Sequence, residues 1–321
     1  MNYKPIIIVA GEPNSVFFEL FFNIVNKKIK IKSPIILIAS KKLIVKQAKI
    51  LKKEMSFNVT SEFEIIKKKN TLKRINLIDV DFKQTFGFGK ITSKSNNYIA
   101  NCFDVAINLL KNNVSDKLIN GPISKKTFLK KKFNGVTEYL ANKTKTKKFA
   151  MIIYNKNLSV CPLTTHLPIK HVSKKINKVE IFSKVKLIKK FWKKKFNKQV
   201  KIGITGLNPH CESIDSFNED NKIITPAIKK LQKYKYNIKG PYAADTIFLK
   251  KNRKKFDLII GMYHDQVLTP IKTLYEYDAI NITIGLPFLR VSPDHGPNET
   301  MLGKNKSNYL SLLNSIKFLD F

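Results

Sequence analysis

The stretch FDLIIGMYHDQ (residues 256–266) opens on an apolar run that ends at a glycine and leads directly into polar side chains. Short runs of this kind, rich in Ile, Val and Leu, recur along the chain and alternate with longer segments of helical spacing. Continuous apolar strands separated by helices are typical of parallel sheets whose two faces are both covered. The sequence therefore predicts an α/β protein with a largely parallel sheet.

The same pattern gives the expected elements. Strands are expected at residues 5–10, 34–39, 75–80, 117–120, 149–154, 158–161, 200–205, 256–261 and 279–284. Helices are expected at residues 16–26, 42–52, 97–111, 136–142, 178–196, 219–234, 244–249 and 310–318. Domain boundaries are expected near residues 125 and 270.

The composition excludes several classes of protein. In a chain of 321 residues, 43% hydrophobic residues suffice for a sizeable core, so a disordered or low-complexity chain is excluded. Three widely spaced cysteines do not form a disulfide framework. No apolar run approaches the roughly 18 residues of a membrane span, and the N-terminus lacks the pattern of a signal peptide. A cytoplasmic protein without membrane contact is expected.

The formal net charge of +37 raises the question of nucleic-acid binding. Only three of the 60 basic residues are arginine: Arg74, Arg253 and Arg290. Recognition of bases and phosphates favours the bidentate fork of Arg, and the lysines are spread along the chain. We therefore interpret most of the charge as a solvated surface, with a Lys-rich nucleic-acid-binding protein as the alternative from another class.

Four polar stretches follow expected strands, and in open α/β sheets ligands bind at the carboxyl ends of the strands. They cover residues 163–170, 206–210, 261–266 and 285–296. Each of the first three contains one histidine: His166, His210 or His264. Neutral imidazoles from several loops suit a divalent ion such as Zn²⁺, although unrelated surface histidines would leave the same spacing.

A second set of residues is suited to an anion. Lys272, Asn281 and Arg290 combine a point charge, an amide and a planar fork, which together suit a phosphate or carboxylate. Asp245 is either a base or the cap of the following helix. No GxGxxG or GxxxxGK[ST] follows a strand, so neither a Rossmann fingerprint nor a P-loop is indicated.

Taken together, these stretches resemble the 4-hydroxythreonine-4-phosphate dehydrogenase family of pyridoxal phosphate biosynthesis. The matching segments are TTHLPIKHV, GLNPH, GPYAADTIF, MYHDQVLTPIK and NITIGLPFLRVSPDHG, in the family's order and spacing over nearly the whole chain. The resemblance implies two α/β/α domains of the isocitrate/isopropylmalate dehydrogenase type, with the active site in the interdomain cleft at a homodimer interface. On this basis the first domain is expected to comprise residues 1–125 plus 270–321, and the second residues 126–269 with the metal-binding loops.

The resemblance also implies an activity: NAD-dependent oxidation of 4-phosphooxy-L-threonine to a 3-keto acid, which loses CO₂ to give 3-amino-2-oxopropyl phosphate. NADP is an alternative to NAD, and the divalent metal is Zn, Mg or Co. The implied metal ligands are His166, His210 and His264, and the implied substrate contacts are Thr137, Lys272, Asn281 and Arg290. The implied active-site aspartate is Asp245, and either Asp245 or a bound water is the candidate base. The implied cofactor contacts are Asp294, His295, Gly296 and Gly303.

The chain departs from the family pattern in three places. The family's GHTE histidine is Val136 here, which removes a hydrogen-bond donor to the substrate phosphate. The glycine-rich turn after the first strand reads GEPNSVFFE, and Asn305 stands where the cofactor-side segment has a second glycine. Val136 keeps a related substrate open, 4-phospho-D-threonate or 4-phospho-D-erythronate. A metal hydrolase without NAD is a further alternative.

Overall fold

The computed structural model describes residues 3–27, 29–67, 72–130 and 132–321. The chain divides into two compact units, one formed by Met1–Thr144 with Pro287–Phe321 and the other by Lys145–Leu286. The chain thus leaves the first unit once and returns to it, at points later in the sequence than the expected positions near residues 125 and 270.

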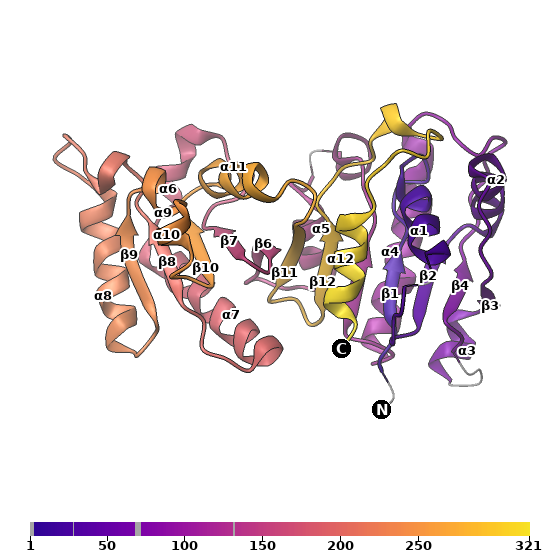
Figure 1. The fold of residues 1–321 in the computed structure, drawn as a ribbon, viewed down its shortest axis with the longest axis horizontal. Helices are drawn as coiled ribbons and strands as arrows, with labels where there is room; N and C mark the ends of the chain where they lie inside the picture. The colour runs from indigo at the N-terminus through magenta and orange to yellow at the C-terminus, as the bar shows by residue number, and fades with distance from the viewer. Residues whose placement is uncertain (1–2, 28, 68–71, 131) are drawn as a thin grey trace. The chain divides into compact units, whose positions relative to one another are not determined.

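The first unit is built on parallel strands in the order β3-β4-β2-β1-β5-β12. These strands are β1 (Ile6–Val9), β2 (Ile35–Ala39), β3 (Asn58–Thr60), β4 (Ile75–Asp79), β5 (Lys117–Asn120) and β12 (Leu289–Pro293). Its α-helices are α1 (Phe17–Asn26), α2 (Lys41–Leu51), α3 (Glu62–Ile66), α4 (Asn96–Lys111), α5 (Val136–Lys143) and α12 (Leu310–Leu319). Strand β1 reads IIIV and is buried at every position, and α4 contacts it. The phenylalanines of α1 are buried as well. Figure 1 shows α12 and α1 close together in this unit.

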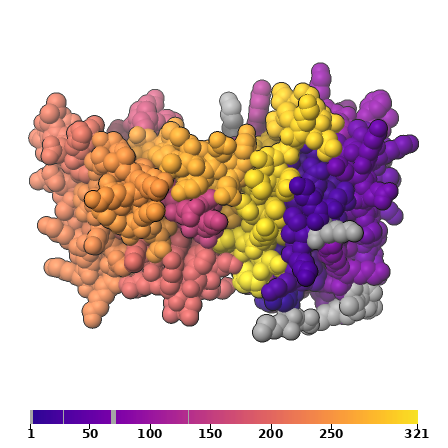
Figure 2. Space-filling model, viewed as in Figure 1, coloured from indigo at the N-terminus to yellow at the C-terminus, as the bar shows by residue number. Residues whose placement is uncertain are grey.

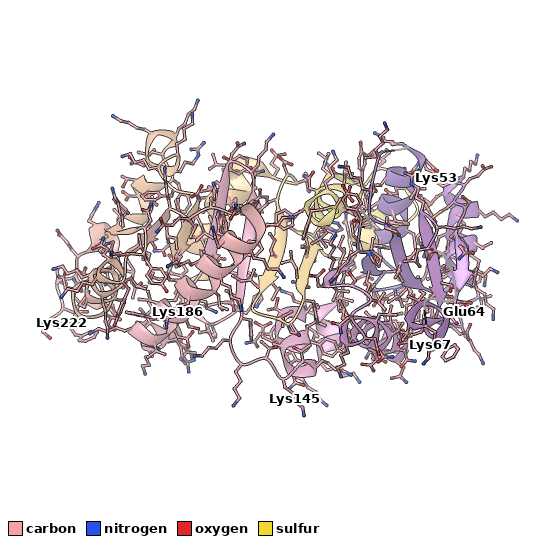
Figure 3. The ribbon with its side chains drawn as sticks, turned by 90° about the horizontal axis from the view of Figure 1, so that it is seen from below. Lys53, Glu64, Lys67, Lys145, Lys186 and Lys222 are labelled. Carbon is pink, nitrogen blue, oxygen red and sulfur yellow. The ribbon has the colours of Figure 1, made fainter. Side chains whose placement is uncertain are left out.

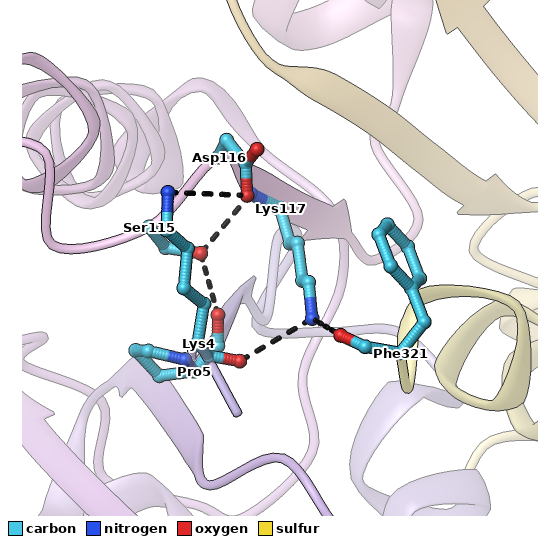
Figure 4. Close-up of polar contacts among 6 residues, drawn as sticks. All are labelled: Lys4, Pro5, Ser115, Asp116, Lys117 and Phe321. Atoms are coloured by element: carbon cyan, nitrogen blue, oxygen red, sulfur yellow. Dashed lines mark hydrogen bonds and ion pairs between the residues drawn. The ribbon is translucent and has the colours of Figure 1, made fainter. Parts of the chain in front are cut away.

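Lys117 lies on β5 and is a buried cation of this sheet (Figure 4). Its Nζ atom donates to the carbonyl oxygen of Phe321 at 2.5 Å and to that of Lys4 at 3.4 Å, and lies 4.4 Å from the centre of the Phe321 ring. Burial lowers the pKa of Lys117. This ammonium group therefore ties the segment after α12 to the start of β5.

The second unit has a mixed sheet with the strand order β11-β6-β7-β10-β8-β9. Its strands are β6 (Ala150–Asn155), β7 (Leu158–Pro162), β8 (Ile202–Thr205), β9 (Ile238–Tyr242), β10 (Leu258–Gly261) and β11 (Ile280–Ile284). Its α-helices are α6 (Val172–Lys175), α7 (Lys178–Phe196), α8 (Thr225–Lys233), α9 (Ala244–Ile247), α10 (Lys250–Arg253) and α11 (His264–Tyr275). Strands β7, β10, β8 and β9 are parallel, whereas β6 pairs antiparallel with both β7 and β11. The carboxyl ends of β7, β10 and β8 therefore lie side by side at one edge of the sheet.

All nine expected strands and all eight expected helices are present within a few residues. Strands β3, β9 and β12 and helices α3, α6, α10 and α11 were not expected. The expected loop at 285–296 contains β12, so Arg290 lies on a strand, and His264 and Lys272 lie on α11 instead of in a loop. Helix α11 continues through Pro270 because Val267, Leu268 and Ile271 are buried in the core of this unit.

The lysines lie mainly on the surface. Lys145, Lys186 and Lys222, which are labelled in Figure 3, are exposed. This agrees with a solvated, positively charged surface. Among the residues that the structure describes, no helix is both long and apolar enough to cross a membrane.

Candidate active site

Three histidines follow the three adjacent parallel strands of the second unit. His166 follows β7, His210 follows β8 and His264 is the first residue of α11, directly after β10. Because β7, β10 and β8 are neighbours and run in the same direction, these residues come from one edge of the sheet. This is the edge at which ligands bind in open α/β sheets.

The structure brings His166 and His264 together, with ring centres 5.5 Å apart. Two imidazoles on one tetrahedral zinc, with Zn–N distances of about 2.1 Å, have ring centres about 5 Å apart. The Nδ1 atom of His264 lies 2.6 Å from Oδ1 of Asp265. Since a carboxylate only accepts, this contact places a proton on Nδ1 and leaves the Nε2 lone pair of His264 for a metal. The pair therefore fits a divalent ion.

His210 does not complete this pair within a single chain. It is exposed in the short helical turn η4 (Pro209–Cys211), with φ of +56°. Across the described ranges, no three His, Cys, Asp or Glu side chains are arranged so that they could hold a metal ion together. His166 shares the left-handed backbone, with φ of +52°.

The other expected residues of the second unit lie on three elements. Lys272 is exposed on α11, and Asn281 lies on β11 with a buried Oδ1 atom that accepts no hydrogen bond. Asp245 is exposed in the first turn of α9, whose N-cap is Ala243, and no side-chain cap bond is present. The alternative of Asp245 as a helix cap is therefore wrong. Burial raises the pKa of Cys211, and the charges of Asp220 and Asp245 raise it further, so the charge of Asp245 acts on the loop that carries His210.

In the first unit, Arg290 is buried on β12 with 3% of its surface exposed. Its Nε donates to Oδ1 of Asn120 at 2.7 Å, and its Nη1 donates to the Thr137 hydroxyl at 3.4 Å. Burial lowers the pKa of Arg290 to about 10, which the nearby Glu138 partly offsets, so the guanidinium remains charged at neutral pH. Thr137 lies in the first turn of α5, where backbone N–H groups favour an anion. Val136, which replaces the family's histidine, is the first residue of this helix.

The expected cofactor contacts also lie in the first unit, in the segment between β12 and α12 (Figure 2, yellow). The Asp294 N–H donates to the Ser311 hydroxyl at 2.9 Å, and His295 Nδ1 lies 3.0 Å from the carbonyl oxygen of Gly296. At Gly296 no atom lies within 4 Å of the position that a Cβ atom would occupy. Gly303 has φ of +73°, a backbone conformation that favours glycine.

This segment is attached to α1 and to the turn that precedes it. The Ser307 N–H donates to Oε1 of buried Glu19 at 2.6 Å, and the Val16 N–H donates to the carbonyl oxygen of Pro297 at 3.1 Å. The segment therefore has a defined conformation along the start of α1.

Two buried polar side chains, Glu12 and Asn14, hold the turn after β1 in place. Glu12 is 2% exposed and accepts from the Asn14 N–H at 3.3 Å and from the Ser95 hydroxyl at 3.0 Å. Asn14 in turn accepts from the Gly89 N–H at 2.8 Å. Burial raises the pKa of Glu12. The side chains of Glu12 and Asn14 thus connect this turn to Ser95 and Gly89.

Comparison with known proteins identifies the family. The sequence model of "Pyridoxal phosphate biosynthetic protein PdxA" matches residues 30–319. The chain belongs to the PdxA family. A 4-hydroxythreonine-4-phosphate dehydrogenase from Sulfurihydrogenibium sp. is 35% identical over 97% of this chain and 95% of that protein. The "Putative D-threonate 4-phosphate dehydrogenase" of Oceanobacillus iheyensis is 30% identical over 98% of this chain and 97% of that protein.

A solved structure agrees with the family. The 4-hydroxythreonine-4-phosphate dehydrogenase from Burkholderia phymatum is 25% identical and superimposes with a TM-score of 0.78, covering 99% of this chain and 98% of that chain. The expected α/β fold of the family is thereby confirmed. As a PdxA-family protein whose relatives are dehydrogenases, the chain is an oxidoreductase.

Four residues with a role in the site's geometry were not expected from sequence: Asn120, Thr164, Asp265 and Gln266. Asn120 ends β5 and orients Arg290, whereas Asp265 follows His264 directly. Thr164 and Gln266 lie within the motifs TTH and HDQ, so their proximity to the histidines was visible. The Thr164 hydroxyl donates to the Met262 carbonyl oxygen, and the Gln266 side chain bonds to Thr205 and Gly206. These partners are distant in sequence, so only the fold reveals them.

Proposed function

We propose that the protein catalyses the NAD-dependent, divalent-metal-dependent oxidation of 4-phosphooxy-L-threonine to its 3-keto acid, which decarboxylates to 3-amino-2-oxopropyl phosphate in pyridoxine 5′-phosphate biosynthesis. The observation that carries the proposal is the pair His166 and His264, whose ring spacing of 5.5 Å suits one metal ion. Membership of the PdxA family supports it independently.

The balance of the reaction defines what the protein must provide. The C3–H bond breaks as hydride leaves, the hydroxyl proton goes to a base, and C3 becomes a ketone. The C1–C2 bond then breaks, CO₂ departs, and a proton returns to C2. NAD⁺ supplies the hydride acceptor, with NADP⁺ as the alternative.

The proposed metal ligands are His166, His210 and His264. A divalent ion bound there, zinc, magnesium or cobalt, supplies Lewis-acid stabilisation of negative charge on the oxygen of the reacting carbon. The Asp265 carboxylate keeps the His264 ring oriented. We propose that the working enzyme is a homodimer with the active site at its interface, as membership of the PdxA family implies.

Asp245 is the proposed base. It is exposed, it carries no capping bond, and its charge reaches the loop of His210. An ionised carboxylate in this position can take the hydroxyl proton as the hydride leaves.

The substrate phosphate is assigned to Arg290, Thr137, Lys272 and Asn281. The buried Arg290 is already oriented by Asn120, so little side-chain freedom is lost when an anion binds. Asn281 lies on β11, and its side-chain NH2 group can donate a further hydrogen bond to the phosphate. Asp294, His295, Gly296 and Gly303 are the proposed contacts to the dinucleotide.

A second candidate is a dehydrogenase for another phosphorylated hydroxy acid, 4-phospho-D-threonate or 4-phospho-D-erythronate. Val136 favours it, because the helix that carries Thr137 begins with a side chain that cannot donate a hydrogen bond. The relative from Oceanobacillus iheyensis supports it as well. The nucleic-acid alternative has no comparable support, since the chain belongs to a family of dehydrogenases and its lysines are dispersed.

The test is NADH formation by the purified protein with a divalent ion on the three phosphorylated acids. Turnover of 4-phosphooxy-L-threonine at the highest kcat/KM supports the proposal, whereas preference for a D-acid supports the second candidate. Absence of turnover on all three, with nucleic-acid binding that persists at physiological salt, would point to the Lys-rich binding protein. The cytoplasmic location stays a prediction.

A further inference from the structure

Gln266 joins two of the histidine loops through all of its polar atoms. Its Oε1 accepts from the Thr205 hydroxyl at 2.8 Å and from the Met262 N–H at 2.7 Å. Its Nε2 donates to the carbonyl oxygen of Gly206 at 2.8 Å. Thr205 and Gly206 stand at the end of β8, and Met262 follows β10. One amide group therefore bridges the starts of the loops that carry His210 and His264.

The third loop, which carries His166, is bonded to the backbone of Met262 and of its neighbour Gly261. The Thr164 hydroxyl donates to the carbonyl oxygen of Met262 at 2.8 Å, and the Leu163 N–H donates to that of Gly261 at 2.7 Å. Met262 is thus bonded to Gln266 through its N–H and to Thr164 through its carbonyl group. Thr164 is two residues before His166 and Gln266 is two residues after His264.

A buried carboxylate extends the connection from Gly206 toward His210. Asp220 is fully buried and accepts from the Leu207 N–H at 2.8 Å and from the Asn208 N–H at 3.1 Å. Its Oδ2 also accepts from the Asn208 side chain at 3.0 Å. Asp220 therefore holds the backbone between Gly206 and Pro209, in addition to the bond that Gln266 makes at Gly206.

Gln266 itself is half-buried, whereas its partners Thr205 and Met262 have no exposed surface and Thr164 has 9%. Loss of the Gln266 amide therefore leaves the buried Met262 N–H without this acceptor. His166 and His210 both have left-handed backbones. Residues other than glycine keep this conformation only where the surrounding structure holds them.

We propose that Gln266 and Thr164 are positioning residues, which hold the loops of His166, His210 and His264 in register through the Met262 peptide. They touch neither substrate nor metal in this role. The inference rests on the proposed function, because the register matters for chemistry only if these histidines bind a metal ion.

Two substitutions at Gln266 distinguish the loss of all three hydrogen bonds from the loss of one. Gln266→Met keeps a similar length and removes all three, whereas Gln266→Glu keeps two acceptor bonds and loses the donation to Gly206. The matched control is Gln232→Met, in the same unit. It removes a single hydrogen bond, from Gln232 Nε2 to the carbonyl oxygen of Ile238. Ile238 lies on β9, which pairs with the edge of β8 that faces away from β10.

The measurements on the full-length protein are the Zn²⁺ dissociation constant, by competition with a chromogenic chelator, and the visible spectrum of the Co²⁺-loaded form. Gln266→Met is expected to weaken Zn²⁺ binding about 10- to 100-fold and to change the Co²⁺ spectrum, with Gln266→Glu between it and the wild type. Gln232→Met should match the wild type in both.

Thr164 provides a second pair of variants in case Gln266→Met does not fold. Thr164→Val removes the hydroxyl with little change of volume and should weaken Zn²⁺ binding, whereas Thr164→Ser retains the donor and should restore it. Wild-type affinity and spectrum in folded Gln266→Met, or in Thr164→Val, would overturn the positioning role alone. Failure of the wild-type protein to bind Zn²⁺ or Co²⁺ would overturn the metal role in the proposed function, and this inference with it.

Discussion

The Arg290 guanidinium donates through Nε to Oδ1 of Asn120 at 2.7 Å, and both side chains are buried in the first unit. The two residues are 170 positions apart in the sequence, on strands β12 and β5 that pair directly. The register of these strands therefore orients the one arginine of three that is buried.

Arg290→Lys is expected to raise the KM for the phosphorylated substrate roughly 10- to 100-fold. A lysine has no planar fork, so the bond to Asn120 and the contact with Thr137 cannot both form, and lost hydrogen bonds to charged groups cost about 1.5–3 kcal/mol. Steady-state kinetics of NADH formation measure the effect. Arg74→Lys is the control, because Arg74 is exposed and bonds to the Ile29 carbonyl oxygen at the surface. An unchanged KM in Arg290→Lys would rule out the phosphate assignment.

His210→Ala is expected to lower metal-dependent NADH formation by at least about 100-fold, since a ligand that supports charge stabilisation is lost. A strong chelator should have the same effect on the wild-type protein. The control is His171→Ala, another exposed histidine in the same unit. Circular dichroism checks that both variants fold. Full activity in folded His210→Ala, or in the chelator, contradicts the metal role.

Asp245→Asn is expected to lower kcat about 100-fold or more and to leave the melting temperature unchanged. The amide cannot accept the hydroxyl proton. Asp245 is exposed and caps no helix, so its replacement costs little stability. The pH dependence of kcat and a thermal melt measure the two effects, with Asp215→Asn, exposed in the same unit, as the control. A kcat equal to that of Asp215→Asn would show that another group is the base.

Glu12→Gln is expected to make the protein more stable than the wild type at pH 7 and to lose that advantage near pH 4. Burial raises the pKa of Glu12 in the folded state, so between about pH 4.5 and this raised pKa the folded protein binds more protons than the unfolded chain. The contribution of Glu12 to stability is thus fully present below the unfolded pKa and is lost as pH rises through the folded pKa. Gln has no such dependence.

Urea unfolding of wild type and Glu12→Gln at pH 4 and pH 7 measures this difference. Glu54→Gln, at an exposed position, is the control and should change little at either pH. If the difference between Glu12→Gln and the wild type were the same at both pH values, burial would not govern the titration of Glu12.

Local sequence patterns predicted neither strand β12 nor helix α11. The run LRVSP contains a charged residue and a proline, so it does not look like an interior strand. Arg290 can lie there because Asn120 accepts a hydrogen bond from its Nε and Glu138 is nearby. Helix α11 contains Pro270, yet burial of Val267 and Ile271 offsets the lost backbone bond. In both cases long-range packing outweighs local propensity.

The sequence by itself determined the family, the α/β class and the positions of most strands and helices, because apolar periodicity and the motifs around His166, His210 and His264 are local. Only the tertiary structure decided that His166 and His264 lie 5.5 Å apart, that Asn120 orients Arg290 and that Gln266 bridges two loops. These contacts join residues about 60 to 170 positions apart, and strand order and register, which depend on the packing of whole units, decide which of them meet.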